Sequence, residues 1–79
     1  MRFDLFDLRL FVAVAETGSI TRAAQRLHIA LAAASSRIRH LEQALGCVLL
    51  LRENRGVRPT AAGQTLLHHA ATVLQQVNR

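Results

Sequence analysis

Arginine is the residue type whose chemistry stands out in this sequence. The chain has ten basic residues, all of them arginine, and five acidic residues, so its net charge at pH 7 is +5. The planar guanidinium group forms paired hydrogen bonds with phosphate oxygens and guanine edges, whereas lysine acts as a point charge. Three of the arginines, Arg52, Arg55 and Arg58, lie within one short stretch. This charge indicates a nucleic-acid binder, with a basic surface that only maintains solubility as the alternative.

The side chains suited to acid–base catalysis or metal binding are His28, His40, His68, His69 and Cys47. No two histidines have the spacing of four residues that points a pair of imidazoles on a helix at one metal ion. The adjacent pair diverges by about 100° around a helix. The sequence also has no glycine-rich phosphate loop. We therefore expect neither an enzyme nor a metal or other cofactor.

The single cysteine excludes an internal disulfide and is typical of a protein from a reducing compartment. Cys47 is most simply a small apolar residue, with redox sensing as the alternative. The sequence has no apolar run long enough to span a membrane, and its first residues are not those of a signal peptide. These features predict a cytoplasmic protein that does not contact a membrane.

The elements that must position these groups are predicted to be mainly helical. The chain has 79 residues, of which 51% are apolar, and it contains no Trp or Tyr. This length allows one small domain, and the abundance of Ala and Leu favours helices. Apolar periodicity and turn residues predict helices over 4–17, 20–27, 30–45 and from 61 onward, with strands over 48–52 and 56–58.

The second and third predicted helices have the features of a helix-turn-helix pair. Ala23 and Ala24 are small enough for a close, steep approach of two helices, and His28–Ile29 form the turn. Ser19 or Thr21 begins the second helix as its N-cap. The third helix has a narrow apolar stripe that must be buried, which consists of Ala34, Ile38, Leu41 and Leu45.

The opposite face of the third helix carries small and polar residues first and arginine further on. Low bulk lets the backbone approach base edges in the major groove, and the positive end of the helix dipole suits phosphate. The arginine-rich hairpin that follows is a wing placed to meet neighbouring phosphates. On the third helix we expect DNA contacts from Ala30, Leu31, Ala32, Ala33, Ser35, Ser36, Arg37, Arg39 and His40. Further contacts are expected from Ser19, Thr21 and Arg22 at the second helix and from Arg52, Arg55 and Arg58 in the wing.

The fourth helix has an apolar stripe that is long for a helix covering a three-helix core. Its later residues extend beyond the reach of that core, so the pattern predicts a partner for them. The expected dimerisation residues are Leu67, Ala70, Val73, Leu74 and Val77. The stripe also runs to the end of the sequence with no Gly or Pro to end the helix. We therefore expect the chain to be a fragment of a longer protein.

The order of the residues over 4–79 resembles the N-terminal domain of LysR-type transcriptional regulators. The combination of matching stretches is specific, and no gap is needed. These stretches are Asp7-Leu8-Arg9-Leu10-Phe11, Val14-Ala15-Glu16, Gly18-Ser19-Ile20-Thr21-Arg22-Ala23-Ala24 with Leu27, Ser35, Ile38-Arg39-His40-Leu41-Glu42, Leu45-Gly46, Arg52, Arg55-Gly56-Val57-Arg58-Pro59-Thr60 and Ala62-Gly63.

The resemblance implies a fold and an assembly. The fold is a mainly α winged helix-turn-helix over 1–59, with a three-helix core and a two-stranded wing, followed by the start of a linker helix over 60–79. That helix dimerises the bacterial regulator, and a C-terminal domain outside this chain binds a small-molecule effector. The third helix lies in the major groove of promoter or operator DNA, and the wing lies on the backbone or minor groove.

The sequence departs from the family pattern where bases would be read. Many members carry Ser-Gln-Pro at the start of the third helix, where this chain has Ala30–Leu31–Ala32, and many carry Arg where it has Ser36. Where many members carry an aromatic residue before the wing, this chain has Leu50. Base reading must then use Ser35, Ser36, Arg37 or Arg39, or methyl contacts from Ala32 and Ala33 to thymine. We also expect a larger share of DNA-shape readout.

A protein-interaction module that uses the winged-helix shape without DNA is the alternative function. It would present an apolar or acidic face on the third helix. The face found here carries Arg and Ser beside the wing arginines, which favours DNA.

Overall fold

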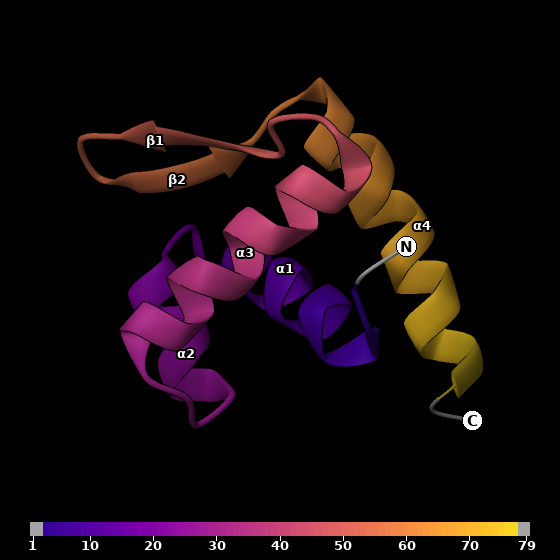
Figure 1. Cartoon of the computed structure of the whole chain (residues 1–79), viewed down its shortest axis with the longest axis horizontal. Coiled ribbons are helices and arrows are strands. Elements are labelled where there is room, and N and C mark those ends of the chain that lie inside the picture. Colours follow the sequence, from indigo (N-terminus) through magenta and orange to yellow (C-terminus); the bar gives the residue numbers. More distant parts are fainter. Residues whose placement is uncertain (1–2, 78–79) are drawn as a thin grey trace.

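The computed structural model describes residues 3–77 and has the predicted mainly α architecture. Three helices form the first half, a two-stranded antiparallel hairpin follows, and a fourth helix completes the described chain (Figure 1). The elements are α1 (Leu5–Thr17), α2 (Ile20–Arg26), α3 (Leu31–Leu45), β1 (Leu50–Glu53), β2 (Gly56–Pro59) and α4 (Ala61–Val77). In Figure 1 the hairpin lies above α3, while α2 and α4 lie at opposite ends of the molecule.

Helix α1 is closed at both ends by its own sequence. The Asp4 carboxylate accepts a hydrogen bond from the Asp7 backbone N–H at 3.0 Å, and the Asp7 carboxylate accepts one from the Asp4 backbone N–H at 3.2 Å. This capping box satisfies two backbone donors that the first turn leaves unpaired. Gly18 ends the helix in the left-handed conformation (φ 69°), which glycine adopts without steric cost.

Helices α2 and α3 form the predicted helix-turn-helix. Ser19 is the N-cap of α2 and accepts the Arg22 N–H at 3.1 Å, so Ser19 rather than Thr21 caps this helix. Ala23 and Ala24 are buried, which allows α3 to approach closely. The turn contains His28 in a left-handed conformation (φ 60°), which is uncommon for a residue other than glycine.

The core lies between α1, α2 and α3 and is closed by the residues that lead into the hairpin. The apolar stripe predicted for α3 is buried at Ala34, Ile38 and Leu41 and packs at Leu45. Phe11 and Val14 of α1 are fully buried opposite it. The remaining buried members of this cluster are Leu10, Ala13, Ile20, Ala23, Ala24, Leu49 and Leu50.

The hairpin begins later than the sequence predicts. Strand β1 starts at Leu50 rather than Val48, and β2 includes Pro59 instead of stopping before it. The physical reason is that the backbone of residues 48–49 forms hydrogen bonds with side chains of α3 and of the residue that caps α4. The Glu42 carboxylate of α3 accepts the Leu49 N–H at 2.8 Å, and the hydroxyl of Thr60 donates to the Val48 carbonyl at 2.7 Å.

Helix α4 is attached to the domain at its N-terminal end and along α1. Thr60 precedes the helix, and its hydroxyl accepts the Gly63 N–H at 3.0 Å as an N-cap does. Gly63 is buried so closely that an added Cβ would lie 2.2 Å from the Leu49 carbonyl oxygen. The expectation that Ala70 extends beyond the core is wrong, because its side chain is 1% exposed where α4 packs along α1. No helix described over 3–77 is long and apolar enough to cross a membrane.

Candidate nucleic-acid interface

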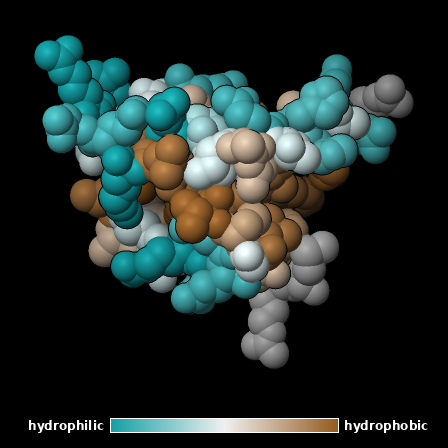
Figure 2. Space-filling model, turned by 90° about the horizontal axis from the view of Figure 1, so that it is seen from above, coloured by the Kyte–Doolittle hydropathy of each residue, from teal (hydrophilic) through white to brown (hydrophobic). Residues whose placement is uncertain are grey.

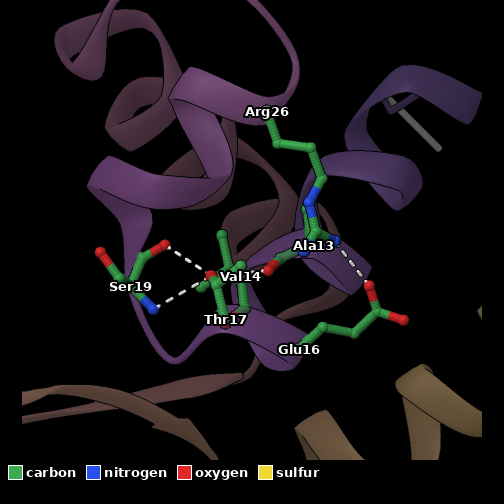
Figure 3. Close-up of polar contacts among 6 residues, drawn as sticks. All are labelled: Ala13, Val14, Glu16, Thr17, Ser19 and Arg26. Atoms are coloured by element: carbon green, nitrogen blue, oxygen red, sulfur yellow. Dashed lines mark hydrogen bonds and ion pairs between the residues drawn. The ribbon is translucent and has the colours of Figure 1, made fainter.

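The corner between α1 and α2 fixes the orientation of the helix-turn-helix (Figure 3). The Thr17 hydroxyl donates to the Ala13 carbonyl at 2.8 Å and accepts the Ser19 N–H at 3.3 Å. Across the corner, the guanidinium of Arg26 pairs with the Glu16 carboxylate at 2.7 Å. Because both partners of this ion pair are exposed, it orients α2 more than it stabilises the fold.

A groove of about 330 Å³ lies between the wing and the beginnings of α2 and α3. It brings together predicted DNA contacts from three separate segments of the chain, namely Ser19 and Thr21, Leu31 and Ser35, and Arg52. The other residues that line it are Ile20, Glu53, Gly56 and Val57. Two helix beginnings, each rich in backbone N–H groups, therefore lie beside an arginine on a single concave surface.

The wing is held at this groove by a backbone contact with the α1–α2 loop. The Val57 N–H donates to the Gly18 carbonyl at 3.0 Å. An added Cβ at Gly56 would lie 2.1 Å from the same oxygen, and Gly56 has φ +135°. A glycine between two short strands is typical of a turn. Its close approach to Gly18 is a second role that a local pattern cannot reveal, because the two residues are distant in the chain.

The exposed face of α3 consists largely of the residues predicted to meet DNA. Residues 30–33, Arg39 and His40 are exposed, whereas Ser35 and Ser36 are half-buried. Ala30 is the N-cap and has no side chain able to accept a hydrogen bond. The first backbone N–H groups of α3 are therefore available to an anion at the positive end of the helix dipole.

The wing arginines differ in what they face. In the hairpin register Arg52 lies opposite Val57, whose side chain packs against the core, so this face looks toward the helices. Arg58 lies on the other face, where its Nε donates to the Glu53 carboxylate at 3.0 Å. Neither Arg52 nor Arg55 has an ion pair with a carboxylate of residues 3–77, so their charge is not neutralised within this part of the chain.

Arg37 has a different environment from the one expected of a DNA contact. Its guanidinium pairs with the buried Asp7 carboxylate at 2.9 Å, lies 3.9 Å from Asp4 and sits 4.7 Å from the centre of the Phe6 ring. The cause is helical geometry, since position 37 lies on the flank of α3 that faces α1. These contacts place Arg37 in the α1–α3 interface, and its expected contact with DNA stays a prediction.

The remaining reactive side chains in the part of the chain described are histidines and one cysteine. His68 and His69 contact each other edge to face, with ring centroids 5.7 Å apart. No group of three or more His, Cys, Asp or Glu residues over 3–77 could hold a metal ion. Cys47, which follows the end of α3, is a free cysteine and is exposed. Seen from above the hairpin, the molecule has a hydrophobic centre between hydrophilic flanks (Figure 2).

Comparison with known proteins identifies the family. The family described as "Bacterial regulatory helix-turn-helix protein, lysR family" matches residues 5–64. The chain belongs to this family. Over 73 residues it is 47% identical to the Hca operon transcriptional activator HcaR of Escherichia coli (strain K12), covering 92% of this chain and 25% of that protein. It is 52% identical over 68 residues to the HTH-type transcriptional regulator ClcR of Pseudomonas putida, covering 86% and 23%. This lysR-family chain thus spans about a quarter of the length of these relatives.

Solved structures share the fold. A complex of the CbnR DNA-binding domain with DNA superposes with a TM-score of 0.92 at 39% identity, covering 98% of this chain and 88% of that chain. The complex of the BenM DNA-binding domain with benA site 1 DNA gives 0.91 at 41% identity, covering 96% and 88%. The lysR-family chain therefore has the winged helix-turn-helix fold, as predicted from its sequence.

The expected dimerisation residues of this lysR-family domain occupy two environments. Leu67 packs against the core and Ala70 is buried within the domain. Leu74 is half-buried, whereas Val73 and Val77 are 40% and 50% exposed. The apolar stripe of α4 therefore continues past the last residues that the domain itself covers.

Proposed function

We propose that this chain is the DNA-binding domain of a bacterial transcriptional regulator and that it inserts α3 into the major groove of duplex DNA. The observation that carries the proposal is the groove between the wing and the beginnings of α2 and α3, with unneutralised Arg52 at its edge. Two domains of the same fold, those of CbnR and BenM, are described in complex with DNA.

In this arrangement the elements have separate roles. The first turns of α3 contribute base contacts from Ala30, Leu31, Ala32, Ala33, Ser35 and Ser36, and Arg39 and His40 lie further along the same exposed face. Ser19, Thr21 and Arg22 at the start of α2 contact phosphate on one side of the groove. Arg52 and Arg55 contact phosphate on the wing side, and Arg58 joins them after exchanging its Glu53 partner.

The proposal includes the assembly. A two-fold pair of domains presents two α3 helices to half-sites about one turn of DNA apart or further. The continuing stripe of Val73, Leu74 and Val77 supports dimerisation through α4, which makes 1–59 the DNA-binding unit and 60–79 the start of a linker helix. We further propose that the whole protein is cytoplasmic, has no catalytic activity and carries an effector-binding domain, because its relatives are regulators about four times longer.

Fluorescence anisotropy with a labelled random-sequence duplex at several NaCl concentrations tests the function. Each phosphate contact releases counterions, so the logarithm of the association constant should fall by roughly 0.9 per contact for each tenfold increase in salt. A flat salt response, or no binding at low salt, would contradict DNA binding and favour the protein-interaction alternative.

A further inference from the structure

Asp7 is a buried carboxylate that has two separate partners. Its side chain is 9% exposed, and one of its oxygens accepts the Asp4 backbone N–H at 3.2 Å within the capping box of α1. The other oxygen lies 2.9 Å from a guanidinium nitrogen of Arg37, which is 30 residues further along the chain. A carboxylate held this far from water keeps its charge at a large cost unless a cation pairs with it. The arginine therefore completes the environment that Asp7 needs.

The pair joins the first turn of α1 to the middle of α3, two helices that pack together in the core (Figure 1). Their apolar contacts resist separation but have little directional preference. The contacts of Arg37 are directional, because they consist of a short hydrogen bond to Asp7 and a planar group 4.7 Å from the centre of the Phe6 ring. This combination fixes the rotation of α3 about its own axis.

The rotation of α3 decides which of its side chains face a bound duplex. Residues 30–33, Arg39 and His40 lie on the exposed face, and contact groups of this kind need support from residues that do not touch the ligand. We propose that Arg37 is a positioning residue for DNA recognition, which acts through Asp7 and keeps its guanidinium on α1 in the complex. This proposal rests on the proposed function and adds the side chains that align the recognition surface.

The ratio of the affinities for a selected and a random duplex is the readout. A duplex is first selected from a random library with this chain, and anisotropy then gives both affinities for the wild type, Arg37→Gln and Asp7→Asn. Partial unfolding lowers both affinities by the same factor, so a loss of stability alone leaves the ratio unchanged. We expect each variant to lower the ratio about fivefold, within the range for residues that act on a site without touching its ligand. The double variant should be no worse than either single variant, because the two side chains act as a unit.

Two further variants separate positioning from charge. Asp4→Asn removes a carboxylate from the same end of α1, but Asp4 is exposed and lies 3.9 Å from the guanidinium, and asparagine is an equally good N-cap. It should leave the ratio unchanged. Arg52→Gln removes a proposed phosphate contact at the groove and should lower the salt slope by about 0.9. Arg37→Gln should leave the salt slope unchanged, because its guanidinium stays on α1.

The outcomes separate the positioning role from the function. If Arg37→Gln lowers the salt slope as much as Arg52→Gln and Asp7→Asn keeps the wild-type ratio, Arg37 contacts phosphate directly and the positioning role is wrong. If both variants fold by circular dichroism and keep the wild-type ratio, the ion pair only stabilises the fold and the proposal is again wrong. In both cases duplex binding by the wild type stands. If Arg37→Gln does not fold, the ratio of Asp7→Asn decides. A wild type that binds no duplex overturns the proposed function, and the positioning role fails with it.

Discussion

The contact between the wing and the α1–α2 loop leaves no room for a side chain at Gly56. An alanine Cβ there would lie 2.1 Å from the Gly18 carbonyl oxygen, and Gly56 has φ +135°. Gly56→Ala must therefore move the hairpin and break the hydrogen bond from Val57 to Gly18. Backbone strain of about 1–2 kcal/mol and about 1 kcal/mol for the lost hydrogen bond give a destabilisation of about 2–3 kcal/mol.

Thermal unfolding followed by circular dichroism measures this loss. We expect Gly56→Ala to lower the Tm by about 10–25 °C, using about 4–8 °C per kcal/mol for a domain of this size. Gly46→Ala is the matched control, because Gly46 also has a positive φ (+70°) but nothing lies within 4 Å of an added Cβ. It should cost only about 1 kcal/mol. Equal Tm values for the two variants would refute the close contact between wing and loop.

The other predictions concern the wing, the core and the fourth helix. Arg52→Ala and Arg55→Ala should each lower the salt slope of duplex binding by roughly one unit without changing sequence preference, as anisotropy against selected and random duplexes would show. Ile38→Ala should cost about 2–5 kcal/mol in urea unfolding because it leaves a cavity in the core, whereas Ser36→Ala should leave the Tm nearly unchanged. A large fall in the Tm of Ser36→Ala would mean that the exposed face of α3 is misassigned. Val77→Glu should abolish concentration-dependent self-association in sedimentation while the domain stays folded, and a wild type that remains monomeric at millimolar concentration would contradict the dimer.

The helices could be predicted because their determinants are local. The burial of Ala34, Ile38 and Leu41 follows from the 3.6-residue period of α3, and the caps at Ser19 and Thr60 are hydrogen bonds across three residues. The wing could likewise be placed from turn residues between two short apolar runs. The exposed residues of α3 that are proposed to contact DNA follow from the same period, since they are those opposite the buried stripe.

What the sequence could not predict depends on contacts between residues far apart in the chain. Arg37 is of the residue type expected to contact DNA, and only the packing of α3 on α1 brings its guanidinium to the Asp7 carboxylate. Glu42 supports the start of β1 through two backbone N–H groups, a role that no local pattern indicates. Ala70 continues a stripe that looks uniform along α4, but its burial depends on how far α1 extends beside that helix.

The central claim is that the groove-lining surface of α2, α3 and the wing binds duplex DNA. Backbone amide chemical shifts of the chain, recorded by NMR as a selected duplex is added, test it most directly. We expect the largest changes at Ser19, residues 31–36 and Arg52, where the groove and the exposed start of α3 lie. Val48 and residues 73–77 should change little at a ratio of one domain per half-site. Changes confined to Val48 and α4, with the start of α3 unaffected, would contradict the account.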